Sequence, residues 1–146
     1  MAIIMLRIHA IQTKEAQKQV CELCSVEFIP DALAYAAYDT PEIPNDPTVS
    51  DEAPGTLLGV AQFAFKKDGA YIYDLRSPEG IDDFEALFIM GRSLLNFVDL
   101  CGTHDAYLAY PDRIEPRLVT AVGFKKRDDG KYYMDLRGFF TKHHGN

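Results

Sequence analysis

Two similar segments lie on either side of a long apolar stretch, and together they limit the folds open to this chain. Residues 65–76 read FKKDGAYIYDLR, and residues 124–137 read FKKRDDGKYYMDLR. Each combines a lysine-rich end, an Asp-Gly pair and a tyrosine-rich run. Asp-Gly between β-forming runs is typical of a hairpin turn. We therefore expect two antiparallel hairpins. The segments between the copies do not match, so we interpret the similarity as convergence, not as an ancestral repeat.

The stretch between the hairpins predicts one long, largely buried helix. Apolar residues from 84 to 98 recur at helical spacing on one face and extend to other sides as well. Asp82 and Glu85 have the spacing of a capping pair, and Gly102 is typical of a C-terminal stop. A strand over 105–110 and a short helix over 118–122, ended by Gly123, follow. Gly91 is interpreted as a point of close packing against the sheet.

The first part of the chain predicts a strand over 6–10, a helix capped by Thr13, an irregular piece over 27–32 and a strand over 33–38. Residues 39–56 contain four of the eight prolines and five acidic residues. We expect a long exposed loop there, either a tolerated insertion or a lid or docking segment. The whole pattern predicts one domain over 1–146, of α/β (α+β) class. A mixed, mostly antiparallel central sheet is flanked by helices.

Charge and cysteine content exclude several classes of function. The formal net charge of −7 disfavours nucleic acid as a partner. No apolar run is long enough for a membrane span, so a cytoplasmic protein is expected. Cys21 and Cys24 form a CxxC, but no second pair completes a zinc site. We expect reduced thiols, with Cys24 facing the core and Cys21 beside it, and no metal.

The chain resembles the GNAT superfamily, the GCN5-related N-acetyltransferases. The resemblance lies in the hairpin LLGVAQFAFKKDGAYIYDL, the helix DDFEALFIMGRSLLNFVDLCG, the strand DAYLAY and the segment LVTAVGFKK, and it covers 57 to about 140. It implies a GNAT-like acyl-CoA N-acyltransferase fold. It also implies transfer of an acyl group from acetyl-CoA, or another acyl-CoA, to a small-molecule or peptide amine. A homodimer is a further expectation.

The resemblance places the cofactor at residues 76–87, RSPEGIDDFEAL. The family's Gln/Arg-x-x-Gly-x-Gly/Ala phosphate loop has no match there, so the loop is degenerate. By analogy, the backbone of Leu75, Arg76 and Ser77 is expected to pair with pantetheine. Gly80 and Ile81 are expected near the phosphates.

The catalytic residue is left open by the sequence. Val119 stands where many family members have the tyrosine that protonates the leaving thiolate. Tyr107 and Tyr110, on the preceding strand, could substitute for it, and Tyr110 is the candidate we choose. Asp74 is left out, because Asp135 repeats it in the second hairpin, away from the cofactor loop. The alternative is a non-catalytic GNAT-like domain that binds a small molecule or a protein partner.

Overall fold

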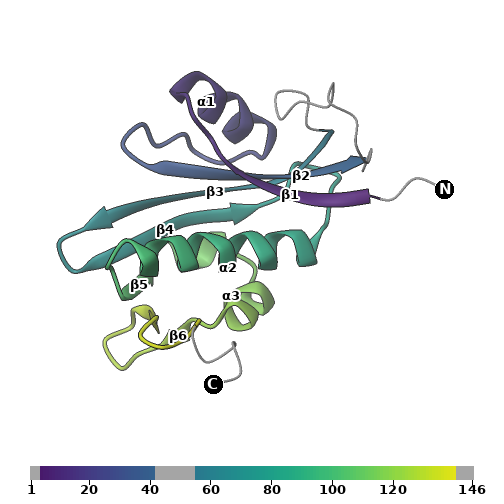
Figure 1. The fold of residues 1–146 in the computed structure, drawn as a ribbon. Helices are drawn as coiled ribbons and strands as arrows, with labels where there is room; N and C mark the ends of the chain where they lie inside the picture. Colours follow the sequence, from purple (N-terminus) through teal and green to yellow (C-terminus); the bar gives the residue numbers. More distant parts are fainter. Residues whose placement is uncertain (1–3, 42–54, 141–146) are drawn as a thin grey trace.

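A computed structural model describes residues 4–41 and 55–140 (Figure 1). The elements in chain order are β1 (Ile4–Ala10), α1 (Lys14–Leu23), β2 (Leu33–Pro41), β3 (Thr56–Lys66), β4 (Gly69–Arg76), α2 (Phe84–Leu100), β5 (Asp105–Leu108), the 3-10 turn η1 (Pro111–Arg113), α3 (Pro116–Val122), β6 (Lys125–Lys126) and β7 (Tyr132–Asp135). This order confirms the predicted succession of strands and helices, with η1 added.

The strands form a mixed sheet in the order β1-β2-β3-β4-β5-β7-β6. Every neighbouring pair is antiparallel except β4 and β5, which run parallel and are joined through α2. The predicted mixed, mostly antiparallel sheet is therefore confirmed. The strand expected over 105–110 ends at Leu108, and the chain turns away there into η1.

Helices cover both faces of the sheet. Figure 1 shows α2 and α3 on one face and α1 on the other. The α2 face carries the main apolar core, in which Leu94 packs with Phe63 and Ile72. The α1 face carries a smaller cluster, where Val20 and Cys24 meet strands β2 and β3. Gly91 packs closely, as predicted, since an added Cβ there would lie 3.2 Å from both Leu75 and Val122.

The helix starts follow from capping hydrogen bonds. The Thr13 hydroxyl accepts a hydrogen bond from the Ala16 N–H at 3.1 Å, as predicted. The cap of α2 differs from the expected Asp82–Glu85 pair. Asp83 is the N-cap, and its carboxylate accepts from the Ala86 N–H at 3.0 Å. Asp82 and Asp83 are adjacent, and either residue can cap a helix, so the backbone geometry selects between them.

The first hairpin turns one residue earlier than its Asp-Gly pair suggests. Lys66 pairs with Gly69, so Lys67 and Asp68 form the turn. Gly69 has a φ of +150°, and a Cβ there would lie 2.4 Å from the Asp105 carbonyl oxygen. The glycine is therefore required by close approach to β5 as well as by its backbone conformation.

A β-bulge interrupts β4 at Tyr73. Gln62 of β3 pairs with Asp74, and the next residue, Phe63, pairs with Ile72, so Tyr73 is an extra residue. Because side chains alternate along a strand, the extra residue shifts the alternation. Ile72 faces α2, and Asp74 faces α1.

Both ends of the loop predicted over 39–56 belong to strands. Residues 39–41 continue β2, and Thr56 opens β3. The remainder, 42–54, lies outside the described residues. Within the described ranges, no helix is long and apolar enough to cross a membrane.

Candidate functional site

The site lies where β4 and β5 separate. Their pairing ends at Ile72 and Leu108, and the last hydrogen bond runs from the Ala109 N–H to the Ile72 carbonyl at 2.9 Å. Strand β4 continues to Arg76 without a neighbour on that side among the described residues. Backbone groups on this open edge can therefore pair with an extended ligand.

Two joined cavities occupy this region. The larger, of about 520 Å³, lies between the end of β4, the loop into α2, and α3. The smaller, of about 450 Å³, lies between β4, the loop after α1, and η1. Both are lined by Ser25, Arg76 and Arg113, so they form one groove.

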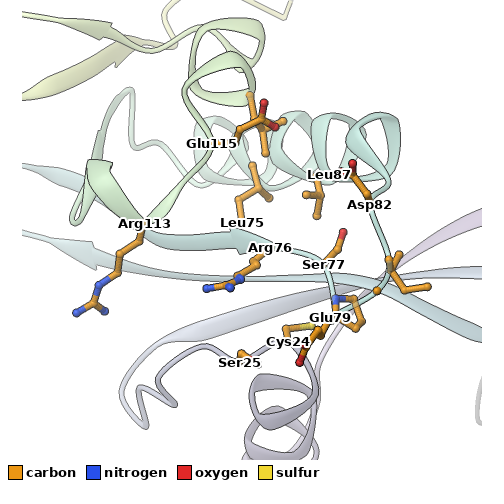
Figure 2. Close-up of a pocket in the computed structure, with 14 residues that line it drawn as sticks. Cys24, Ser25, Leu75, Arg76, Ser77, Glu79, Asp82, Leu87, Arg113 and Glu115 are labelled. Carbon is orange, nitrogen blue, oxygen red and sulfur yellow. The ribbon is translucent and has the colours of Figure 1, made fainter.

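All five residues expected to bind the cofactor line the larger cavity: Leu75, Arg76, Ser77, Gly80 and Ile81. Figure 2 shows Leu75 on the α2 side of β4 and Arg76 pointing to the opposite side. The hydroxyl oxygen of Ser77 is buried and has no hydrogen-bond partner within the described part of the chain. A buried hydroxyl without a partner is costly, so a ligand in this cavity would be stabilised by bonding to it.

The loop between β4 and α2 differs from a phosphate-binding loop. Gly80 is its only glycine, with a φ of +84° and open space where a Cβ would point. Glu79 and Asp82 line the cavity (Figure 2), and the Asp83 carboxylate already caps α2. Carboxylates oppose the approach of a pyrophosphate, and Asp83 already takes one of the N–H groups at the helix start.

Asp74 forms the inner wall of the smaller cavity and is 5% exposed. One carboxylate oxygen accepts from the Gln62 backbone N–H at 2.9 Å, and the other from the Gln62 side-chain amide at 2.8 Å. Burial raises the pKa of Asp74 from 3.8 to about 6, although these hydrogen bonds and the charge of Arg113 act in the opposite direction. A carboxyl group with such a pKa can accept protons near neutral pH.

A buried polar network links Asp74 to α1. The Gln62 side-chain oxygen accepts from the Gln17 amide at 2.9 Å and from the Ile29 N–H at 3.0 Å. The Gln62 amide nitrogen also donates to the Glu27 carbonyl at 2.7 Å. The loop after α1, which borders the groove, is therefore fixed to the same strand pair that carries Asp74.

The two repeated aspartates do not share an environment. Asp135 lies at the surface, where its side chain is 53% exposed and pairs with Arg137 at 3.0 Å. A hydrogen bond from the Arg137 backbone N–H lowers the pKa of Asp135, whereas burial raises that of Asp74. The recurrence of Asp-x-Arg is thus no reason to exclude Asp74. Its apolar neighbours, Leu75 and Ile72, were the available sequence signal for burial.

Tyr110 lies beside the groove but outside the residues that line its two cavities. It is 41% exposed and directly precedes η1. Its ring lies 6.0 Å from that of Tyr73, and the Arg113 guanidinium lies 4.1 Å above it. Val119, which holds the family's tyrosine position, is buried in the core.

The CxxC thiols are buried. Cys21 and Cys24 are free and inaccessible, and burial raises the pKa of each to about 12. Such thiols hold little of the reactive thiolate. Both face the interior, so Cys21 is more deeply placed than expected. Among residues 4–41 and 55–140, no group of three or more His, Cys, Asp or Glu side chains is arranged to hold a metal ion.

Comparison with known proteins gives matches at the level of structure. No family model matches the sequence, and no curated protein matches it. An IAA acetyltransferase from Bacillus cereus is 15% identical, with a TM-score of 0.58, over 85% of this chain and 79% of that one. A Bacillus subtilis acetyltransferase solved with CoA is 12% identical, with a TM-score of 0.59, over 90% and 99%.

A spermidine/spermine N-acetyltransferase from Vibrio cholerae, solved in mutant forms, is 10% identical, with a TM-score of 0.59, over 94% of this chain and 99% of that one. These identities are low, so the matches establish architecture and leave chemistry open. The shared architecture includes the mixed sheet and its flanking helices. The chain therefore has the acyl-CoA N-acyltransferase fold of the GNAT superfamily.

Proposed function

We propose that this protein is a divergent acyl-CoA-dependent N-acyltransferase that acts on an amine. The observation that carries the proposal is a single groove with two distinct ends. One end offers the open edge of β4 and the Ser77 hydroxyl, which has no partner among residues 4–41 and 55–140. The other end offers the buried carboxyl group of Asp74. An acyl transfer needs a binding edge for its donor and a proton acceptor for its amine.

The larger cavity fits the pantetheine arm of an acyl-CoA better than it fits the pyrophosphate. Leu75, Arg76 and Ser77 would hold the arm, by backbone pairing and by the Ser77 hydroxyl. Gly80 and Ile81 line the part of the loop toward the phosphates, where Glu79 and Asp82 disfavour anions. The thioester supplies the acyl carbon, so that a C–N bond forms, the C–S bond breaks and CoA leaves as a thiol.

Asp74 is the group that this geometry assigns to proton removal. An ammonium acceptor must lose one proton before its nitrogen can attack, and the Asp74 carboxylate can take that proton. The second proton leaves the nitrogen after C–N bond formation and is passed to the departing sulfur through water or through Tyr110, at the rim of the groove, which gives its own proton to sulfur and takes the one from nitrogen. Asp74 then releases its proton to solvent.

A donor assay tests this proposal directly. Purified protein is mixed with acetyl-CoA and a panel of amines, and released thiol is measured with a colorimetric reagent. We expect amine-dependent thiol release, together with a calorimetric signal for acetyl-CoA. Absence of heat at millimolar acetyl-CoA would contradict the proposal.

The second candidate is a non-catalytic GNAT-like domain that binds a small molecule or a protein. Glu79 and Asp82 favour it, because both lie where a CoA phosphate would approach. This candidate predicts ligand binding in the groove without acyl transfer. Acylated amine detected by mass spectrometry would eliminate it.

Two further parts of the proposal concern setting and assembly. We propose that the protein acts in the cytoplasm and as a homodimer. Phe97 and Leu100, near the end of α2, are exposed apolar residues that a second copy could cover. Light scattering at micromolar concentration measures the molar mass, and the mass of a monomer would contradict the proposed homodimer.

A further inference from the structure

We propose that the acceptor is a small amine that also carries a carboxylate, and that Arg113, with Arg76, binds this carboxylate. The inference rests on the proposed function and names its substrate class. It is drawn from the smaller cavity, where charges of both signs lie around one space: Glu27, Asp74, Asp112, Arg76 and Arg113.

One carboxyl group of this cavity is buried, and its other charged groups are not. Asp74 is nearly inaccessible, whereas Arg76 and Arg113, like Glu27 and Asp112, are exposed. Figure 2 shows both arginine side chains pointing to the same side of β4, away from α2 and toward the loop after α1. A bound molecule would therefore meet a carboxyl group within the groove and two guanidinium groups at its mouth.

Arg113 is held in place by an aromatic ring. Its guanidinium lies 4.1 Å from the centre of the Tyr110 ring, and that ring packs against Tyr73. Such a cation–π contact limits the movement of the guanidinium, while N–H groups that are not bonded to Glu27 can bind a carboxylate. The geometry thus presents a preorganised fork at the groove, as carboxylate recognition requires.

The existing partner of Arg113 is replaceable. Glu27 lies 3.3 Å away, and the side chains are 51% and 66% exposed, respectively. Ion pairs this exposed contribute little stability, so a ligand carboxylate can compete for Arg113. Arg76 has no ion pair among the described residues, so its guanidinium can also bind a ligand carboxylate.

The charge pattern selects among amines. A polyamine would bring further positive charge to two guanidinium groups, which costs energy even near a protein surface. An amine without an anion would leave Arg113 paired only with the exposed Glu27, and Arg76 without an ion pair among the described residues. A molecule with one ammonium and one carboxylate satisfies Asp74 and the arginines together. Arg113 and Asp74 line the same cavity of about 450 Å³, so one small molecule can reach both.

Matched acceptors test the inference. Each of several L-amino acids is compared with its own α-amide, which keeps the amine and removes the carboxylate, and with spermidine. We expect kcat/KM for the amino acids to exceed that for the amides by about tenfold or more, the usual effect of losing a charged hydrogen bond. Equal rates for acids and amides, or a preference for spermidine, would overturn the acceptor class while leaving the proposed function intact.

A variant separates the role of Arg113 from donor binding. Arg113→Gln should raise KM for the amino acid about tenfold or more, leaving kcat and the KM for acetyl-CoA unchanged. Arg113→Lys should recover part of the loss. Arg127→Gln makes the same charge change in the turn of the second hairpin, where Arg127 pairs with Asp129, and should have no effect. A higher KM for acetyl-CoA alone would show that Arg113 serves the donor, and the inference would fail.

A binding measurement covers the case in which no amine is acylated. If acetyl-CoA also gives no heat, the proposed function has failed. Calorimetry with the amino acids alone then decides the inference. Amino-acid binding that is lost in Arg113→Gln but kept in Arg127→Gln supports the carboxylate site, and no binding to the wild-type protein overturns it.

Discussion

The two hairpins that share a sequence differ in where the fold puts them. Strand β4 of the first lies in the middle of the sheet, and β6 and β7 of the second lie at its edge. Asp74 is consequently buried beside Gln62, whereas Asp135 pairs with Arg137 at the surface. Similar local sequence thus gives a hairpin in both places, with turns of different length, and the position in the sheet decides which aspartate is buried and has a raised pKa.

The largest expected difference between the hairpins is in activity. Asp74→Asn should lower kcat/KM by about 10²- to 10⁴-fold, the usual contribution of a general base. In the wild type, kcat/KM should fall as pH drops through about 6, and the variant should lack this dependence. Asp135→Asn, the matched change, should leave the rate unchanged. An Asp74→Asn protein of normal activity would show that the base lies elsewhere.

Removing the partner of each aspartate should change the free energy of unfolding by different amounts. Gln62→Leu leaves the Ile29 N–H, the Glu27 carbonyl and Asp74 without their buried partner, and should cost about 3–5 kcal/mol. Arg137→Gln removes only exposed ion pairs and should change urea unfolding little. Similar midpoints for the two variants would mean that the Gln62 network contributes nothing.

The pH dependence of stability should have opposite signs at the two aspartates. The folded state binds the Asp74 proton more tightly than the unfolded chain does. The stabilisation is therefore fully present below pH 3.8 and is lost as pH rises through about 6, a change of about 3 kcal/mol. Asp135, whose pKa is lowered, adds stability above its ordinary pKa that is lost as pH falls. Urea titrations of the wild type and both Asn variants between pH 3 and 7 would measure the two slopes.

The smallest contrast concerns the glycines of the turns. Gly69→Ala places a Cβ against the Asp105 carbonyl in an unfavourable backbone conformation, and should cost about 2–3 kcal/mol. Gly130 has a φ of +87° and open space around it, so Gly130→Ala should cost about 1 kcal/mol, from conformation alone. Thermal unfolding of the two variants gives the comparison, and equal losses would indicate that β5 does not approach Gly69 closely.

Sequence patterns were sufficient for the elements and for the loop that borders the larger cavity. Alternation and helical spacing identify β4 and α2, and these two elements place Ser77 and Gly80 between them. The predicted N-cap of α2 was wrong by one residue, Asp82 instead of Asp83, because several acidic residues adjoin the start of the helix. The burial of Asp74 could not be read from the sequence for a different reason. It depends on Gln62, twelve residues away, and on the loop between α1 and β2, and neither pairing is visible in local sequence.

The bulge at Tyr73 decides which side chain of β4 faces the groove. Ile72 and Asp74 are two apart, and in an uninterrupted strand both would point into the apolar layer beneath α2. The extra residue turns Asp74 toward the groove and returns Leu75 to the core. If Tyr73 were instead paired as an ordinary strand residue, the faces of those two neighbours would be exchanged, with a carboxyl group in the core and a leucine in the groove. Deleting Tyr73 would leave Asp74 opposite Gln62 in a regular ladder, still facing the groove. The groove therefore depends on the pairing of β3 with β4 and not on the identity of the bulged residue.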